Sequence, residues 1–292
     1  MSKVLTINSI DVEITNQDKI LFPEDKITKG DLVKYYQKIS PIMLPLIYDR
    51  PITMHRFPNG IDSDGFYQKD LTGNIPKWVK TKKISKKSEG STSYAVCDNP
   101  ATLIYLANLG VIEPHIWLSK IDKLHYPDRL IFDFDSEKPQ FKKVCKAAKI
   151  IKEVLDKLEL ESFVMTTGSK GLHVVVPLNT RKNNFDFVKN FARNLSQKLL
   201  ENNPELFTLE IRKEKRGEKI FIDFLRNAFA QTGVAPYGVR AKPGAPVATP
   251  LSWSELDDPK LTAQKYNIKN IFKRISRIAE KKKKINKIKQ TL

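Results

Sequence analysis

Residues 130–135 read Leu130-Ile131-Phe132-Asp133-Phe134-Asp135. In a β-strand, successive side chains point to opposite faces of the sheet. A strand here would place Asp133 and Asp135 on one face and the rings of Phe132 and Phe134 on the other. The stretch therefore predicts a buried strand with an apolar face toward the core and two neighbouring carboxylates on the opposite face.

The sequence after this strand alternates between helix-like and strand-like hydrophobic patterns. Beyond the strand at 129–134, we expect the following elements: a helix at about 139–158, a strand at 162–166, a tight turn at 167–171, a strand at 172–178, a helix at about 183–202, and strands near 207–211 and 219–224. Interleaved strands and helices with one hairpin are typical of a mixed α/β or α+β fold and argue against a helical bundle or a β-sandwich.

The first half of the chain is less regular. Alternating apolar residues at 4–14 predict a short hairpin, and a strand is expected at 52–57. A helix is predicted to begin after Thr28, the expected N-cap, with Asp31 in its first turn. The apolar segment 101–111 indicates a buried helix. We expect residues 1–270 to form one catalytic domain of two packed subdomains, and 271–292 a basic tail or helix.

Positive charge is the most unusual feature of the composition. The chain has 51 Lys and Arg against 33 Asp and Glu, a net charge of +18. Residues 273–289 hold nine basic side chains and one acid, so they contribute +8 and leave about +10 on the rest of the chain. This excess favours nucleic acid as a partner. The alternative is a lysine-rich surface that is solvated and binds nothing.

Cysteine content and hydropathy indicate the compartment. Cys97 and Cys145 form no C-x-x-C pair, so they predict neither a zinc ribbon nor a disulfide framework, and both are interpreted as core thiols. Neither an apolar leader at the N-terminus nor a run of about 18 apolar residues is present. We expect a cytoplasmic protein without a membrane partner.

A third acid lies in a context like that of the first two. Asp223 follows the apolar run Ile220-Phe221-Ile222. Carboxylates held together repel each other unless a cation lies between them, and three suffice for the two Mg²⁺ or Mn²⁺ ions of phosphoryl transfer. The D-x-D pattern alone also occurs in glycosyltransferases, in phosphatases of the haloacid dehalogenase type and as strand-end acids. The phosphatase pattern expects Thr or Val where Glu137 stands.

The predicted turn at 167–171, which follows the strand at 162–166, is rich in small residues and carries one lysine. It reads Thr167-Gly168-Ser169-Lys170-Gly171 and runs into Leu172-His173. Ser169, Lys170 and His173 could bind phosphate oxygens, together with backbone N–H groups. The alternative is an ordinary hairpin turn beside a core histidine.

The long basic loop 226–244 contains Arg226, Arg240 and Lys242. These cations could neutralise a triphosphate or a template strand. The alternative is an exposed loop.

Four segments together resemble one known family. They are 126–135, 167–173, 222–227 and 234–247, and the similarity extends from about Asn16 to Trp253. They resemble the polymerase domain of bacterial DNA ligase D, within the archaeo-eukaryotic primase superfamily. The resemblance implies an α+β (mixed α/β) primase-type catalytic core, in which an RRM-like subdomain packs on an α/β subdomain.

The resemblance also implies roles for individual residues. Two Mn²⁺ (or Mg²⁺) ions would be held by Asp133, Asp135 and Asp223. The phosphates of a nucleoside triphosphate would be bound by Ser169, Lys170, His173 and Arg240. The base would stack on Phe66 and Tyr67, where the family usually has two phenylalanines. The 5′-phosphate of a downstream DNA strand would be bound by Lys19 and Lys29.

The implied activity is template-directed nucleotidyl transfer that fills gaps and extends ends in non-homologous end joining and prefers ribonucleotides. The expected partners are DNA with gaps or ends, Ku and a separate DNA ligase, at the nucleoid. Since the sequence lacks a ligase K-x-D-G motif, we expect polymerisation without sealing. The alternatives are a primase that initiates chains de novo, a non-catalytic DNA-end-binding protein and a phosphatase.

Overall fold

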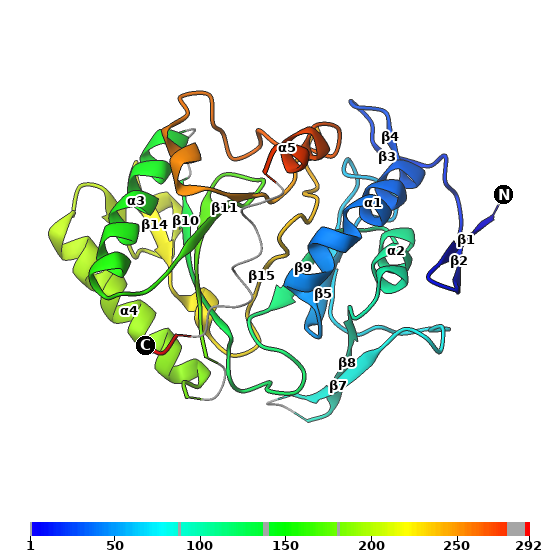
Figure 1. Ribbon diagram of the computed structural model, residues 1–292, viewed down its shortest axis with the longest axis horizontal. Coiled ribbons are helices and arrows are strands. Elements are labelled where there is room, and N and C mark those ends of the chain that lie inside the picture. Colours follow the sequence, from blue (N-terminus) through cyan, green and yellow to red (C-terminus); the bar gives the residue numbers. More distant parts are fainter. Residues whose placement is uncertain (1, 87–88, 137–139, 180–181, 279–289) are drawn as a thin grey trace. The chain divides into compact units, whose positions relative to one another are not determined.

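The computed structural model describes residues 2–86, 89–136, 140–179, 182–278 and 290–292. It contains two compact units, neither of which is continuous in sequence (Figure 1). The first unit comprises residues 1–122, 232–246 and 267–269. The second comprises residues 123–231, 247–266 and 270–292.

A six-stranded sheet forms the centre of the second unit, in the order β13-β14-β10-β12-β11-β16. Its elements are β10 (Arg129–Asp135), α3 (Phe141–Lys157), β11 (Phe163–Thr166), β12 (Leu172–Pro177), α4 (Phe185–Asn202), β13 (Phe207–Thr208), β14 (Ile220–Asp223) and β16 (Pro250–Leu251). The run β10-α3-β11-β12-α4-β14 with antiparallel strand order β14-β10-β12-β11 is the ferredoxin-like topology of RRM domains. The predicted RRM-like subdomain is confirmed.

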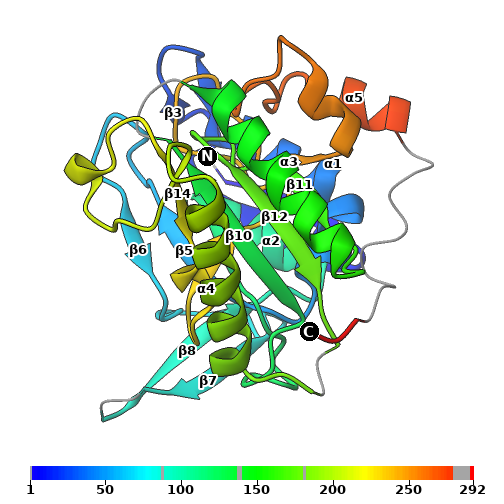
Figure 2. The ribbon, with the colours of Figure 1, turned by 90° about the vertical axis from the view of Figure 1, so that its left-hand side faces the viewer.

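Both long helices of this unit cover the same face of the sheet, as Figure 2 shows. Phe132 and Phe134 are fully buried in this layer, with Val144 and Ile151 of α3 and Val188 of α4. Because side chains alternate along β10, its aspartates lie on the face that the helices do not cover.

Shorter helical segments complete the second unit. They are η1 (Lys213–Lys215), η2 (Leu225–Asn227), η3 (Trp253–Asp257) and α5 (Ile271–Ile278). The beginning of the predicted tail or helix at 271–292 is thus helical. Residues 279–289, which hold its lysine run, lie outside the described residues.

The first unit is built on a second sheet, of order β15-β9-β5-β8-β7, with β6 also paired to β5. Its elements are β1 (Lys3–Ile7), β2 (Ile10–Ile14), β3 (Ile20–Phe22), β4 (Ile27–Thr28), α1 (Lys29–Ile47), β5 (Pro51–Arg56), β6 (Phe66–Gln68), β7 (Thr81–Ser85), β8 (Ser91–Val96), α2 (Pro100–Asn108), β9 (Val111–Trp117) and β15 (Thr232–Val234). β1 pairs with β2 and β3 with β4, so the hairpin predicted at 4–14 is confirmed.

Local sequence sets the ends of the helices in this unit. Thr28 and Asp31 form a capping box at the start of α1, as predicted. The prediction of a helix at 101–111 is wrong at its C-terminal end. Helix α2 stops at Asn108, and Gly110 turns the chain with a φ of +79°. Val111 then begins β9, a central strand that the sequence reading did not identify.

One strand was not predicted and one prediction was wrong in length. The unpredicted strand is β7, an edge strand with two lysines among its five residues. The strand predicted at 207–211 ends at Thr208, because the Thr208 hydroxyl accepts a hydrogen bond from the N–H of Glu210 and turns the chain. Both cysteines are buried, as predicted.

In the described part of the chain, no helix has both the length and the apolar character needed to span a membrane.

Candidate active site

Sheet register brings the aspartates of the second unit together. Asp133 of β10 lies opposite Asp223 of β14 on one side and opposite His173 of β12 on the other. Asp135 follows on the same face, two residues along β10. Asp133 is almost completely buried, whereas Asp135 and Asp223 are partly exposed. Three carboxylates and one imidazole therefore share one small region of the sheet.

One arginine joins two of the aspartates. Nη2 of Arg226 lies 3.0 Å from Oδ2 of Asp133 and 3.2 Å from Oδ2 of Asp223. The backbone N–H of Arg226 also donates to Oδ1 of Asp223, at 3.2 Å. The sequence suggested that Arg226 could contact a triphosphate or a template strand. In the structure its guanidinium bridges the carboxylates.

The pKa values of the two bridged carboxylates shift in opposite directions. Burial opposes ionisation of Asp133, but the charges of His173 and Arg226, with the hydrogen bond from Arg226, outweigh it and lower the pKa of Asp133. Burial raises the pKa of Asp223, assisted by the nearby charge of Asp133, although Arg226 opposes this rise. Asp133 is therefore held as a carboxylate, and Asp223 lies where a further positive charge would be favourable.

A buried asparagine fixes the position of Arg226. The Asn227 side chain is fully buried, accepts a hydrogen bond from the N–H of Ile131 at 2.8 Å and donates to its carbonyl at 2.7 Å. These bonds attach η2 to the edge of β10. Asn227, the neighbour of Arg226 in the chain, is thus bonded to Ile131, which lies two residues before Asp133 in β10. The arginine that contacts Asp133 is therefore held by the same strand.

The turn at 167–171 is closed by its own threonine. The Thr167 hydroxyl accepts hydrogen bonds from the N–H groups of Ser169 and Gly171. These two N–H groups therefore point into the turn, whereas the sequence analysis expected backbone N–H groups of this turn to bind phosphate. Ser169 is partly exposed and Lys170 is exposed. Gly171 is required by space, because a Cβ there would lie 2.0 Å from the Phe134 carbonyl and 2.5 Å from Oδ1 of Asp135.

The chemistry of this cluster fits divalent cations. Carboxylate oxygens are the ligands that Mg²⁺ and Mn²⁺ prefer. In the described part of the chain, Oδ1 of Asp133 is buried and accepts no hydrogen bond, although His173 Nε2 lies 3.4 Å away. A buried carboxylate oxygen in this state is an available ligand atom.

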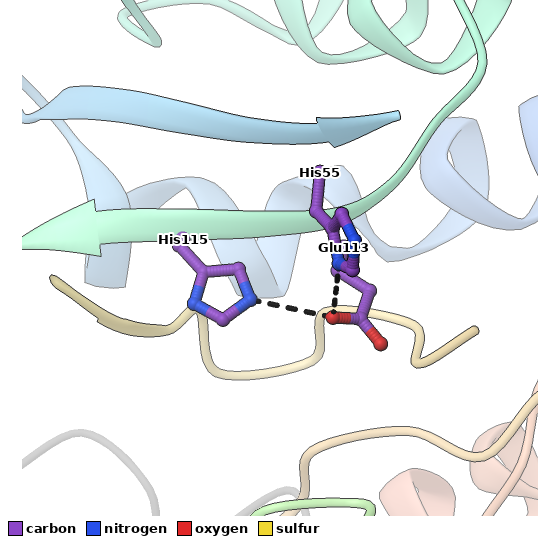
Figure 3. Close-up of side chains that lie close together, drawn as sticks. All are labelled: His55, Glu113 and His115. Carbon is purple, nitrogen blue, oxygen red and sulfur yellow. Dashed lines mark hydrogen bonds and ion pairs between the residues drawn. The ribbon is translucent and has the colours of Figure 1, made fainter. Parts of the chain in front are cut away.

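Arg240, which the resemblance assigned to phosphate binding, lies in the first unit. Its Nε donates to Oε1 of Glu113 at 2.9 Å, and the N–H of Ala241 donates to the same oxygen at 2.8 Å. The other oxygen, Oε2, lies 2.9 Å from Nδ1 of His55 and 3.4 Å from Nε2 of His115 (Figure 3). Burial opposes ionisation of Glu113, but the two histidines and Arg240 outweigh it and hold its pKa well below the usual range.

The aromatic pair of the first unit lies on β6. Phe66 and Tyr67 are exposed, with 45% and 59% of their surface accessible. The Tyr67 ring stacks on the His55 ring, with centroids 4.0 Å apart and planes 9° apart. The guanidinium of Arg56 lies 5.4 Å from the centroid of the Phe66 ring. Both aromatic residues thus offer surface for a stacking partner.

The two lysines assigned to a 5′-phosphate have different environments. The backbone N–H of Lys29 donates to the Lys19 carbonyl, so the two residues are adjacent. Lys19 Nζ donates to Asn59 Oδ1 at 2.8 Å. Lys29 is buried, and its Nζ donates to Thr15 Oγ1 and the Asn108 carbonyl, each at 3.2 Å. Burial first, and the charge of Lys19 second, lower the pKa of Lys29.

The sequence reading missed the cluster of His55, Glu113 and His115. A signal was present, because Glu113-Pro114-His115 places an acid and a histidine on the same face of a strand. The pairing of Glu113 with His55, which lies 58 positions earlier, depends on the register between β5 and β9.

Comparisons with known proteins agree with this architecture. The multifunctional non-homologous end joining protein LigD of Mycolicibacterium smegmatis is 34% identical over 253 residues, covering 86% of this chain and 33% of that protein. The bifunctional non-homologous end joining protein LigD of Bacillus subtilis is 29% identical over 267 residues, covering 91% of this chain and 43% of that protein. The chain therefore spans less than half the length of these relatives.

A solved structure matches almost the whole chain. It is the polymerase domain of Mycobacterium tuberculosis ligase D in complex with DNA, with a TM-score of 0.88 and 29% identity, covering 96% of this chain and 99% of that one. The family model for the LigD primase-polymerase domain matches residues 28–281. The chain belongs to the family of LigD primase-polymerase domains.

Proposed function

We propose that this protein is a metal-dependent, template-directed nucleotidyltransferase that fills gaps and extends ends during non-homologous end joining, with a preference for ribonucleotides. The observation that carries the proposal is the register that sets Asp133 opposite Asp223, with Asp135 on the same face of β10. Two-metal nucleotidyl transfer requires carboxylates grouped in this way.

Three aspartates would hold the cations. Two Mn²⁺ or Mg²⁺ ions, when bound, would supply a Lewis acid for the attacking 3′-hydroxyl and a counter-charge for the pyrophosphate. The protein contributes a carboxylate at Asp133 that His173 and Arg226 keep ionised. It also holds Arg226 against both Asp133 and Asp223 through the anchored Asn227.

Each unit, taken separately, has residues that are proposed to contact the incoming nucleotide. In the second unit, Ser169 and Lys170 lie at an accessible turn, and His173 lies beside Asp133. In the first unit, Arg240 offers a guanidinium that Glu113 orients, and the exposed Tyr67 ring offers a stacking surface. Charge-assisted hydrogen bonds suit phosphate, and aromatic rings suit any base.

DNA is the proposed polymer partner. The net charge of +18 favours a polyanion, and Lys19 with Lys29 would bind the 5′-phosphate of a downstream strand. The relatives are named as end joining proteins, and the related polymerase domain was solved with DNA. By extension, Ku and a DNA ligase are proposed partners in the same repair reaction.

Primer extension tests the proposal. The substrate is a gapped duplex with a 5′-phosphate, incubated with Mn²⁺ and each ribo- or deoxynucleoside triphosphate in turn. We expect template-directed addition, faster with ribonucleotides, and no addition by the Asp133→Ala, Asp135→Ala double variant. Asp186→Asn, which changes an exposed carboxylate on α4 of the same unit, is the control and should retain full activity.

Two results would overturn the proposal. DNA binding without nucleotide addition by the unmodified protein would favour a non-catalytic end-binding protein. Addition by the double variant at the parent rate would show that the aspartates do not hold the catalytic metals.

A further inference from the structure

Three side chains of the first unit converge on a single point. His55 of β5 lies opposite Glu113 of β9 in the sheet register, and His115 follows Glu113 on the same face. Figure 3 shows both imidazoles directed at the same carboxylate oxygen of Glu113. All three ligand atoms lie within 4.8 Å of one another. The grouping is set by the register of two central strands.

We propose that His55, Glu113 and His115 form a metal site for a zinc-type transition ion, made of different residues from the three aspartates. Two imidazoles and one carboxylate are a ligand set that zinc uses in enzymes, where a fourth position is left for water or substrate. Mg²⁺, by contrast, prefers oxygen ligands.

The distances fit this assignment. Zinc bonds of about 2.0–2.1 Å in a tetrahedral site place neighbouring donor atoms about 3.3 Å apart. The distances from Glu113 Oε2 to the imidazole nitrogens are 2.9 Å for His55 and 3.4 Å for His115. The imidazole nitrogens lie within 4.8 Å of each other, so the two rings would turn toward a common point to occupy three corners of a tetrahedron.

Neighbouring groups orient the three ligands. Oε1 of Glu113 accepts from Arg240 Nε and from the Ala241 N–H, which leaves Oε2 on the side of the histidines. Tyr67 stacks on His55 and restricts rotation of its ring. Such outer-shell contacts are typical of metal sites and raise affinity by pre-organising the ligands.

The site is reachable from solvent. Glu113 has only 5% of its side chain accessible, whereas His55 has 17% and His115 has 12%. An ion can therefore reach the imidazoles, and a fourth ligand can approach from the same side. When the ion binds, the proton on each imidazole nitrogen that faces Glu113 moves to the other nitrogen of the ring or is released to solvent, so that each histidine coordinates as neutral imidazole.

The competing interpretation is a purely structural cluster, in which Glu113 accepts hydrogen bonds from two histidines. Substituting any of the three residues would destabilise the protein under both interpretations, so stability cannot distinguish them. Metal content and the visible spectrum of bound Co²⁺ can, because a four-coordinate site gives strong cobalt bands, whereas octahedral cobalt with carboxylate and water ligands gives weak ones.

The experiment uses the full chain carrying Asp133→Ala and Asp135→Ala, which weakens cation binding at the aspartates. This protein is stripped with a chelator, loaded with Zn²⁺ or Co²⁺ and desalted. We expect one ion per chain and a four-coordinate cobalt spectrum. His55→Ala or His115→Ala, added to this background, should weaken binding by more than the roughly 10- to 100-fold that loss of an outer-shell partner costs.

His125→Ala is the matched control, because His125 is exposed in the second unit and stacks on Phe229. It should bind zinc like the background protein. Absence of bound metal from the background protein, or an octahedral cobalt spectrum, would overturn the proposal. The spectrum needs no histidine variant, so the result stands even if His55→Ala or His115→Ala fails to fold. Primer extension is not a readout, so failure here leaves the proposed polymerase activity untouched.

Discussion

Asp133 and Asp223 face each other across neighbouring antiparallel strands and are joined by the guanidinium of Arg226. The arrangement combines opposing charges in one partly buried region. Without a cation between them, the two carboxylates would repel each other strongly. Arg226 therefore contributes to the stability of the second unit as well as to the electrostatics of its candidate active site.

Arg226→Ala should destabilise the protein when divalent ions are absent. We expect the free energy of unfolding to fall by roughly 2–3 kcal/mol, less than the roughly 3–5 kcal/mol for a fully buried pair, because the Arg226 side chain is 29% accessible. Mn²⁺ should restore part of this loss. Urea unfolding in chelator and in Mn²⁺ measures both, with the exposed Arg212→Ala as control. Unchanged stability of Arg226→Ala in chelator would show that the bridge contributes nothing.

Gly171→Ala should impair catalysis by moving the turn. Its Cβ would meet the Phe134 carbonyl at 2.0 Å, and backbone cannot yield as a flexible side chain can. The turn with Ser169 and Lys170 must then move away from β10, and a displacement near 1 Å lowers kcat by roughly 10- to 100-fold. Single-turnover primer extension measures this. Gly73→Ala, whose Cβ meets no atom within 4 Å although its φ of +96° strains an alanine locally, serves as control for a glycine substitution without a steric clash. Full activity of Gly171→Ala would refute the steric argument.

Lys19→Ala should reduce discrimination for a 5′-phosphate. Its ammonium donates a hydrogen bond to Asn59 at an exposed position. Loss of one charge-assisted bond to phosphate should weaken binding of 5′-phosphorylated gapped DNA about tenfold. Fluorescence anisotropy with 5′-phosphate and 5′-hydroxyl substrates measures the difference. Lys34→Ala, with 76% of the Lys34 side chain accessible, should bind both substrates like the parent. Equal loss on both substrates would assign Lys19 to the DNA backbone instead.

Local patterns were sufficient to predict the main strands and both long helices of the second unit. The period-two alternation of 129–134, the amphipathic helices and the glycine-rich turn each depend on residues close in sequence, and they define β10, α3, β11, β12 and α4. The same alternation placed Asp133 and Asp135 on one face. These features were predictable because the apolar side chains of the strand and of the helices that cover it must all be buried, and this requirement sets the local hydrophobic pattern of each element.

Non-local pairing was not predictable in the same way. The register that sets Asp133 against Asp223 joins residues 90 positions apart, and nothing in either strand specifies it. The bridge from Arg226 and the cluster around Glu113 depend on such registers too. No local pattern indicated that Lys29 is buried, with its Nζ against Thr15 and Asn108. That contact depends on packing of the α1 start beside the end of α2.

Asn227→Ala should destabilise the second unit by removing the anchor of η2. The substitution leaves the buried N–H and carbonyl of Ile131 without the partner that Asn227 supplies. Each unsatisfied group costs about 1–3 kcal/mol, so we expect a loss of about 3 kcal/mol in the free energy of unfolding. Urea unfolding measures it, with the exposed Asn202→Ala as control. A loss no larger than that of the control would show that water replaces the amide.

The attachment of α5 should depend on pH through Glu255. Both oxygens of Glu255 accept from Arg274, at 3.1 Å from Nε and 2.8 Å from Nη2. Burial opposes ionisation, but the bonds from Arg274 and the Ser252 N–H outweigh it and lower the pKa of Glu255 from its ordinary value of 4.5. A carboxylate whose pKa is lowered on folding stabilises the folded state above its unfolded pKa, and this contribution is lost as the pH falls through the folded pKa.

Glu255→Gln should therefore be less stable than the parent at pH 7, and the difference should shrink as the pH falls below 4.5. Hydrogen exchange of the α5 amides, with urea unfolding at each pH, separates local release of the helix from global unfolding. Asp257→Asn, which changes a neighbouring carboxylate that is 71% accessible and pairs with Lys149, is the control. A Glu255→Gln deficit that stays constant from pH 7 to below 4.5 would mean that packing of the side chain, and not its charge, holds α5 to η3.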